Sequence, residues 1–133
     1  MIVRITVVGT GYVGLVTGTC LAETGNDVVC VDCDRQKVEL LTRGEIPIYE
    51  PGLSELVLRN AADRRLSLSD DLPAAVAAAQ MVSLAVGTPS AADGSVDLSA
   101  LRSAGEGTAP LLARAAQVVL KMTVLVRTKS AVL

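Results

Sequence analysis

The sequence predicts an α/β domain built around a doubly wound parallel sheet. Three observations lead to this prediction: short β-branched apolar runs alternate with stretches of helical periodicity, a glycine-rich turn joins the first run to the first helix, and 133 residues suit a single domain. Strands that are apolar along their whole length are typical of parallel sheets covered by helices on both faces. Right-handed crossovers between such strands give the Rossmann-type arrangement.

The first half of the chain is expected to alternate strands with helices. Ile2–Val8 is β-branched and ends at a glycine, which predicts a strand, and Gly11–Thr24 follows as a helix that Gly25 ends. The side chains expected on the inward face of this helix are Val13, Val16, Cys20 and Leu21. A strand, a helix, a loop with two prolines, a helix and a short strand come next, at Val28–Val31, Asp34–Thr42, Gly44–Gly52, Leu53–Ala62 and Leu66–Leu68.

The uncharged stretch Leu72–Ala92 is long enough to span a bilayer, but it contains two prolines, a glutamine and a glycine. We interpret it as a buried helix, a strand at Met81–Val86 and the start of a loop, so a membrane is not an expected partner. Ser69 or Asp70 is expected to cap the helix, with Pro73 in its first turn.

The last elements are a loop, a helix and a strand. The loop is expected at Gly87–Val96, and Asp97 is expected to cap a helix that runs to about Arg114. Val118–Lys121 is predicted to be the last clear strand.

The composition excludes several kinds of chemistry. The chain has no histidine, so it lacks an imidazole base, a Ser-His-Asp triad and any zinc site that needs histidine. With no Phe or Trp, two tyrosines and a net charge of −2, nucleic acid is not an expected partner. The three cysteines are an odd number, which argues against a disulfide framework. We expect small buried thiols at Cys20, Cys30 and Cys33, no metal site and a cytoplasmic protein.

The pattern Gly-x-Gly-x-x-Gly follows the first predicted strand and opens the first helix, at Gly9, Gly11 and Gly14. Gly9 would permit the tight turn, Gly11 would let a diphosphate approach the backbone, and Gly14 would let the helix pack closely on the sheet. Asp32 ends the second strand, 18 positions after Gly14, where its carboxylate could accept hydrogen bonds from both hydroxyls of an adenosine ribose. The same carboxylate would repel a 2′-phosphate, so the pattern predicts NAD rather than NADP.

Two other interpretations stay open at this point. The glycines could simply form a turn, with Asp32 as an ordinary residue at the end of a strand. Methyltransferases that use S-adenosylmethionine also pair a glycine-rich first loop with an acidic residue after the second strand, and an open sheet alone does not separate the two classes.

Longer motifs are similar to those of the UDP-glucose/GDP-mannose 6-dehydrogenase family, and look most like its UDP-glucose branch. They are Val8–Leu15 (VGTGYVGL), Gly44–Leu53 (GEIPIYEPGL), Val86–Pro89 (VGTP) and Asp93–Asp97 (DGSVD). The resemblance covers the chain from Met1 to about Thr128. It implies an NAD-binding domain of enzymes that oxidise the primary alcohol of a nucleotide sugar through a thiohemiacetal and a thioester.

The resemblance also implies roles for individual residues. The amides around Tyr12 and Val13 would contact the pyrophosphate, Asp32 and Lys37 would hold the adenosine ribose, and Thr88 and Thr123 would line the site further along the cofactor. Lys37 could instead be a solvated helix residue, and Thr88 a turn residue.

The chain departs from the family in two places. The nucleophilic cysteine of the family lies in a glycine-rich segment with no match here, so no catalytic residue is assigned. Met122, Leu125 and Arg127 replace a hydroxyl, a proline and a glycine of the family's pattern, which puts the contact of Thr123 in doubt.

We therefore interpret residues 1–133 as an NAD-binding domain that ends before the catalytic and substrate-binding domains and is inactive alone. In a full-length parent enzyme, UDP-glucose and NAD would give UDP-glucuronate, and the nucleotide sugar would be a partner only there. A stand-alone NAD-sensing module is the alternative from another class. The domain could also form a homo-oligomer.

Overall fold

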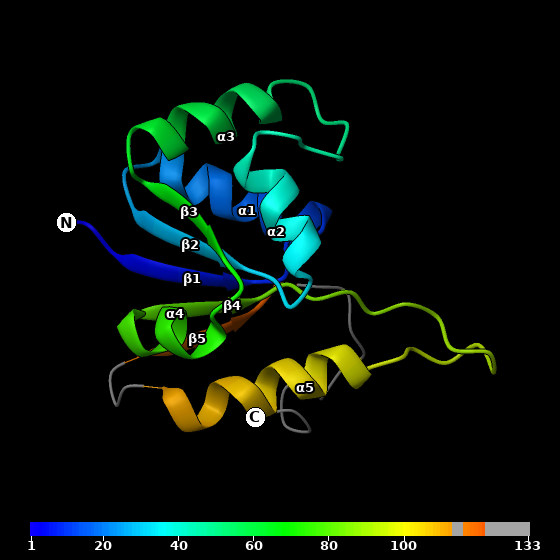
Figure 1. Cartoon of the computed structure of the whole chain (residues 1–133). Coiled ribbons are helices and arrows are strands. Elements are labelled where there is room, and N and C mark those ends of the chain that lie inside the picture. The colour runs from blue at the N-terminus through cyan, green and yellow to red at the C-terminus, as the bar shows by residue number, and fades with distance from the viewer. Residues whose placement is uncertain (113–115, 122–133) are drawn as a thin grey trace.

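The computed structural model describes residues 1–112 and 116–121, and confirms the predicted fold class. Within these residues, five parallel strands form one sheet in the order β3-β2-β1-β4-β5 (Figure 1). The strands are β1 (Arg4–Val8), β2 (Asp27–Val31), β3 (Leu66–Ser69), β4 (Met81–Leu84) and β5 (Gln117–Leu120). The order reverses direction between β1 and β4, as in a doubly wound α/β sheet.

Helices cover both faces of the sheet (Figure 1). On one face lie α1 (Tyr12–Glu23), α2 (Arg35–Thr42) and α3 (Leu53–Ala62). On the other lie α4 (Leu72–Ala78) and α5 (Ser99–Thr108), which a short 3-10 turn extends over Ala109–Leu111. The loop between β4 and α5 extends away from the body of the domain (Figure 1).

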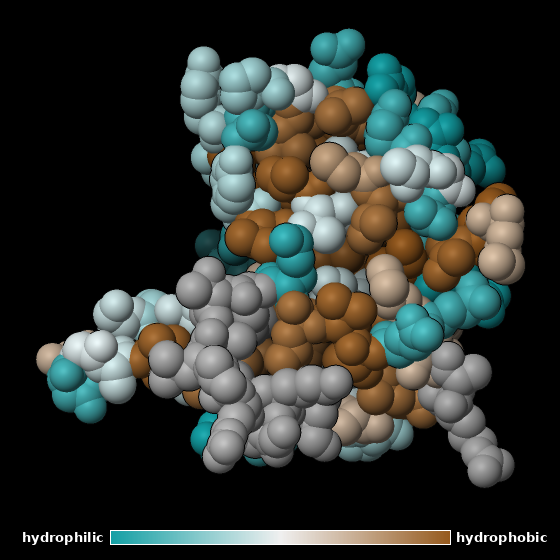
Figure 2. Space-filling view, turned by 180° about the vertical axis from the view of Figure 1, so that it is seen from behind, coloured by the Kyte–Doolittle hydropathy of each residue, from teal (hydrophilic) through white to brown (hydrophobic). Residues whose placement is uncertain are grey.

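Each face of the sheet has its own hydrophobic cluster, so the central strands β1, β2 and β4 are buried from both sides. One cluster packs α1 and α3 on the sheet and includes Leu15, Val57 and Val28. The second packs α4 and α5 on the opposite face and includes Val76 and Leu101. This explains why β1, β2 and β4 are mostly apolar without the regular alternation of a half-exposed sheet. Seen from behind, apolar side chains reach the surface across the middle of the domain, below a more hydrophilic upper part (Figure 2).

The inward face expected for the first helix is wrong at two positions. Val13 is 41% exposed and Cys20 is also exposed, while Val16 and Leu21 are partly buried. The buried residues of α1 are mostly small: Gly14, Leu15, Gly18, Thr19 and Ala22. The helix lies so close to the sheet that small residues, rather than the largest apolar ones, form the contact face.

The ends of the later elements also differ from expectation. Asp71, rather than Ser69 or Asp70, caps α4, because its carboxylate accepts a hydrogen bond from the Ala74 amide at 3.0 Å. The Ser69 hydroxyl accepts from the Asp71 amide instead.

The helix expected to reach Arg114 is shorter and begins later. Asp97 accepts from the Ser99 amide at 2.9 Å, although Leu98 is the residue at the cap position. The helix ends at Thr108, because Pro110 has no N–H to continue the pattern and the chain tightens into a 3-10 turn.

The long apolar stretch from Leu72 divides into α4, β4 and the start of a loop, as expected. In the part of the chain that the structure describes, no helix has both the length and the apolar character needed to cross a membrane.

Candidate functional site

A cleft of about 800 Å³ opens at the carboxyl ends of the strands, at the point where the strand order reverses. This is where open α/β sheets bind their ligands. Seven of the nine residues selected from the sequence line this cleft: Gly9, Gly11, Tyr12, Val13, Asp32, Lys37 and Thr88. Gly14 lies behind the turn, and Thr123, with Met122, Leu125 and Arg127, lies outside the described residues.

Gly9 sits where the end of β1 passes between the ends of its two neighbours. Its φ of +104° favours glycine, and its amide donates to the Val31 carbonyl at 2.7 Å. A Cβ at this position would lie 2.7 Å from the carbonyl oxygen of Ala85, which follows β4. The turn therefore requires glycine for both conformation and space.

Gly14 brings the first turn of α1 against that turn. A Cβ on Gly14 would lie 1.8 Å from the Gly9 carbonyl oxygen, so any side chain would push the helix away from the sheet. The role expected for Gly14 from the sequence, close packing of helix on strand, is the role it has in the structure.

Gly11 differs from both, because no contact with the described residues requires a glycine there. Its φ of −71° is open to any residue, and a Cβ would meet no atom of the described residues within 4 Å. Gly11 precedes α1, whose first amides have no partner within the helix and whose first turn carries no acidic residue. The missing side chain thus leaves room for an anion at the positive end of a helix.

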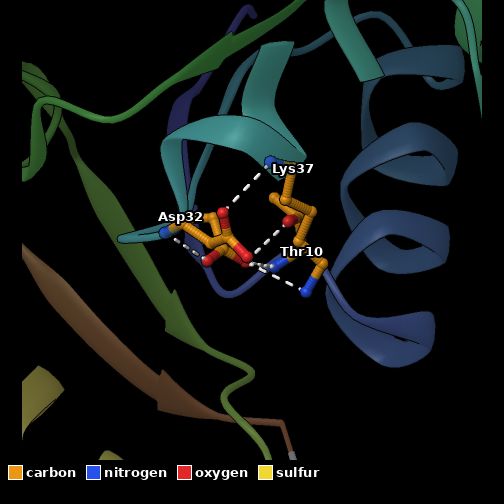
Figure 3. A network of polar contacts seen from close by, with 4 residues as sticks. Thr10, Asp32 and Lys37 are labelled. Atoms are coloured by element: carbon orange, nitrogen blue, oxygen red, sulfur yellow. Dashed lines mark hydrogen bonds and ion pairs between the residues drawn. The ribbon is translucent and has the colours of Figure 1, made fainter. Parts of the chain in front are cut away.

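Asp32, at the end of β2, is held by four donors (Figure 3). Its Oδ2 accepts from the Thr10 amide at 3.0 Å, the Thr10 hydroxyl at 2.6 Å and the Lys37 ammonium at 3.4 Å. Its Oδ1 accepts from the Asp34 amide at 3.0 Å. Burial raises the pKa of this carboxyl, but the hydrogen bonds from Thr10 and Asp34 and the charge of Lys37 outweigh burial and lower it below 3.8.

Lys37 is placed by the first turn of α2. Asp34 caps this helix by accepting from the Lys37 amide at 3.2 Å, which turns the lysine side chain toward Asp32. The Lys37 side chain is 36% exposed and that of Asp32 is 12% exposed. Lys37 is therefore the solvent-facing partner of a mostly buried carboxylate.

Two residues that were not selected from the sequence contact residues of the cleft: Thr10, which also lines it, and Glu50. Thr10, between the first two glycines, makes two of the four contacts to Asp32. Glu50, in the loop before α3, accepts a hydrogen bond from the hydroxyl of Tyr12. That hydrogen bond and the negative charge of Glu50 raise the pKa of Tyr12. Thr10 could have been found from its position after β1. Residues that follow adjacent parallel strands lie close together, and Asp32 follows the neighbouring strand β2.

The far side of the cleft combines apolar and polar residues from the other half of the sheet. Thr88 follows β4, Lys121 follows β5, and Ser103 and Ala104 come from α5. The cleft therefore extends from Asp32 across the strand ends to β5, an elongated shape that suits a dinucleotide.

The cysteines differ from the expectation of three buried thiols. All three are free, and only Cys30 is buried, where burial raises the pKa of its thiol to about 12. Cys20 and Cys33 are exposed, and Cys33 lines the cleft beside Asp32. Its exposure follows from its position two residues beyond the end of β2, where the chain leaves the sheet.

Comparison with known proteins agrees with this geometry. Residues 3–133 match the family model described as "UDP-glucose/GDP-mannose dehydrogenase family, NAD binding domain". A UDP-glucose 6-dehydrogenase of Rhizobium meliloti is 52% identical over 126 residues, which are 94% of this chain and 29% of that protein. One from Bacillus subtilis is 50% identical over 103 residues, 77% of this chain and 22% of that protein.

Solved structures give the same result. A ternary complex of GDP-mannose dehydrogenase from Pseudomonas aeruginosa superposes with a TM-score of 0.91 at 34% identity, over 97% of this chain and 30% of that one. A UDP-glucose dehydrogenase from Pyrobaculum islandicum gives 0.88 at 37% identity, over 96% and 30%. The chain thus spans less than a third of the length of these relatives.

These matches support neither a methyltransferase nor a stand-alone sensing module. The glycine turn, the start of α1 and the Asp32 carboxylate meet at one cleft, and the family match assigns NAD to the domain. The chain belongs to the UDP-glucose/GDP-mannose dehydrogenase family and corresponds to its NAD-binding domain.

Proposed function

We propose that the cleft holds NAD with its diphosphate against the amides of Tyr12 and Val13 and its adenosine ribose on Asp32 and Lys37. The observation that carries this proposal is the open space at Gly11, where the domain itself needs no glycine. A diphosphate in that space would be close to the first amides of α1, which have no partner within the helix. Gly9 and Gly14 shape the turn that presents them.

The other end of the cofactor would extend along the cleft toward Thr88 and, beyond the described residues, Thr123. The resemblance to the family supports both assignments, and the position of Thr88 in the cleft supports the first. When bound, NAD supplies a hydride acceptor. The residues of this chain bind and orient it.

We further propose that residues 1–133 serve as the NAD-binding domain of a longer enzyme that oxidises UDP-glucose to UDP-glucuronate, with the substrate held by other parts of that enzyme. The similarity to UDP-glucose 6-dehydrogenases supports this choice of substrate. None of Cys20, Cys30 and Cys33 matches the family's nucleophile, so this chain alone is expected to bind NAD without turnover. Three free thiols fit a reducing, cytoplasmic location.

The proposal is tested by calorimetric titration of the 133-residue chain with NAD and NADP. We expect tighter binding of NAD, because the Asp32 carboxylate would repel a 2′-phosphate. Gly11→Ala should weaken NAD binding by about tenfold or more, since its methyl group would occupy the diphosphate space. The same variant should keep the melting temperature, because the added Cβ meets no atom of the described residues.

Gly25→Ala is the matched control. Gly25 lies in the turn after α1, away from the cleft, at a φ of +96°. Alanine there should lower the free energy of unfolding by about 1–2 kcal/mol and leave the NAD affinity unchanged. Full NAD affinity in Gly11→Ala, or no affinity in the unsubstituted chain, would contradict the proposal. Light scattering of the same samples would test the homo-oligomer expected from the sequence.

A further inference from the structure

Thr10 is buried, with 1% of its surface exposed. Both of its hydrogen-bond donors, the amide and the hydroxyl, point at one carboxylate oxygen of Asp32, which follows β2. Its amide and its hydroxyl donate to Oδ2 of Asp32, at 3.0 and 2.6 Å (Figure 3). An ionised carboxylate only accepts hydrogen bonds, so the hydroxyl proton of Thr10 must point at Asp32. A separation of 2.6 Å is typical of a strong, charge-assisted O–H···O⁻ bond.

The hydrogen bonds leave little acceptor capacity on Asp32. Thr10 supplies two donors, Lys37 one and the Asp34 amide one, against about four lone-pair positions on a carboxylate. The Lys37 contact, at 3.4 Å, is the longest of the four and comes from a partly exposed side chain. An incoming hydroxyl would therefore displace Lys37 first and leave the buried Thr10 contacts in place.

Thr10 also belongs to the glycine turn, between Gly9 and Gly11. The hydroxyl of Thr10 thus joins the turn that presents the helix amides to the strand end that carries the carboxylate. Without this hydroxyl, the Thr10 amide and the Asp34 amide still contact Asp32, but the shortest of its four hydrogen bonds is lost.

We propose that Thr10 is a positioning residue of the cofactor site, whose hydroxyl holds the Asp32 carboxylate at a fixed place relative to the diphosphate-binding turn. This inference rests on the proposed function, because it concerns how the same cleft receives the ribose. Thr10 acts through Asp32. The class of ligand that it serves is a nucleotide with a free ribose 2′-hydroxyl.

The hydroxyl also stabilises the ionised form of Asp32, which gives the proposal a readout in pH. Its hydrogen bond is one of the contributions that lower the pKa of this carboxyl against the effect of burial. Removing it should raise the pKa, so NAD binding should fall off at a higher pH. Among the described residues, the other titratable or charged side chains that line the cleft or cap α2 beside Asp32 are Tyr12, Cys33, Asp34, Lys37, Asp70 and Lys121, and all stay in place in the comparison below.

The experiment compares Thr10→Val, which keeps the shape and removes the hydroxyl, with Thr10→Ser, which keeps the hydroxyl. NAD affinity is measured by calorimetry from pH 4 to 8, and folding by circular dichroism. Thr10→Val should weaken NAD binding about 5- to 20-fold and move the acid limb of the affinity profile to higher pH. Thr10→Ser should restore the affinity to within about twofold and restore the profile.

Thr10→Ala, which adds no volume, replaces Thr10→Val if the valine variant does not fold. Wild-type affinity and pH profile in the variant without the hydroxyl would overturn the proposal. Equal weakening in Thr10→Val and Thr10→Ser would overturn it too, because the shape of the side chain would then matter rather than its hydroxyl.

A ligand-free measurement separates this inference from the proposed function. The carboxyl of Asp32 can be titrated by ¹³C NMR in the wild type and in Thr10→Val. A higher pKa in the variant supports the hold of Thr10 on Asp32 even if no nucleotide binds, in which case only the proposed function fails. An unchanged pKa overturns the inference, whatever the affinity of the wild type for NAD.

Discussion

Gly18 of α1 lies directly over the thiol of Cys30 on β2. A Cβ on Gly18 would lie 2.4 Å from the Cys30 Sγ, and 3.5 and 3.6 Å from methyl carbons of Val7 and Val28. Real carbon and sulfur atoms do not approach so closely, so no side chain fits at position 18. The helix and the sheet can be this close because Gly18 lies opposite the small side chain of Cys30. This contact sets how close α1, which presents the anion-binding amides, lies to the sheet.

The pair predicts a compensating size exchange. Gly18→Ala should lower the free energy of unfolding by about 1–3 kcal/mol, because the methyl group overpacks a buried contact. The gain of up to about 1 kcal/mol in helix propensity offsets only part of this. In Gly18→Ala/Cys30→Ala the sulfur is gone, and most of the loss should be recovered. Urea unfolding of the two single variants and the double variant measures the coupling, and strictly additive losses would contradict it.

The hydroxyl of Thr6 joins the sheet to α4, which lies on the face of the sheet opposite to α1. Thr6 is buried on β1, and its Oγ1 donates to the carbonyl of Ala75 in α4 at 2.8 Å. Thr6→Val keeps the shape but leaves that carbonyl without this donor, so we expect a loss of about 1–3 kcal/mol in unfolding free energy.

Thr24→Val provides the control for Thr6→Val. Thr24 makes a similar bond, 2.8 Å to the carbonyl of Leu21, but in an exposed position. Water can replace that donor, so the loss should stay below about 0.5 kcal/mol. Equal losses in the two variants would show that burial of the Ala75 carbonyl does not matter.

Local sequence patterns predicted those parts of the site that depend on the backbone turn after β1 and on the place where β2 ends. Gly9 and Gly14 have the surroundings that their spacing indicated, and Asp32 follows β2 as expected, because a strand, a tight turn and a close helix leave few alternatives. The alternation of strands and helices predicted the doubly wound parallel sheet, and the structure supplied the order of its strands. These features depend on contacts that repeat in every doubly wound sheet.

Patterns failed where side chains from distant segments meet. Periodicity placed Val13 and Cys20 inward, yet helix and sheet are too close at Gly14 and Gly18 for large residues to lie between them. The contact of Thr10 with Asp32 joins residues 22 positions apart, and no local rule indicates which side chains at two strand ends will touch. Such contacts are set by register and packing.

Arg64, two residues beyond α3, adopts a φ of 58°, in the left-handed region that favours glycine. An L-residue there costs about 1–2 kcal/mol, while glycine loses about 0.5–1 kcal/mol more chain entropy on folding. Arg64→Gly should therefore raise the free energy of unfolding by about 0.5–1 kcal/mol. Chemical denaturation of the variant beside the wild type measures this gain.

Arg43→Gly is the opposite control for that gain. Arg43 directly follows α2, one residue nearer to its helix than Arg64 is to α3, and it has right-handed helical angles, with φ at −77°. Glycine there relieves no strain and should cost about 0.5–1 kcal/mol. The two substitutions should thus change stability in opposite directions, and a loss in both would show that the Arg64 backbone is not strained.

The stability of the domain should depend on pH through Asp32 and Glu23. The pKa of Asp32 is lowered because the hydrogen bonds from Thr10 and Asp34 and the charge of Lys37 outweigh burial. The pKa of Glu23 is lowered mainly by its hydrogen bond from Asn60. Between the folded and unfolded pKa values of such a group, the unfolded chain binds more protons, so stability rises with pH there.

The stabilisation should therefore be complete above the ordinary pKa values of 3.8 and 4.5, and be lost as the pH falls through the lower values of the folded state. Urea unfolding at several pH values from about 3 to 7 measures this slope. Asp32→Asn removes one of the carboxyls with a lowered pKa while leaving a side-chain oxygen for Thr10, so its slope below about pH 5 should be flatter than that of the wild type. An unchanged slope would mean that the pKa of Asp32 is the same in the folded and the unfolded chain. The hydrogen bonds from Thr10 would then not stabilise the ionised carboxylate.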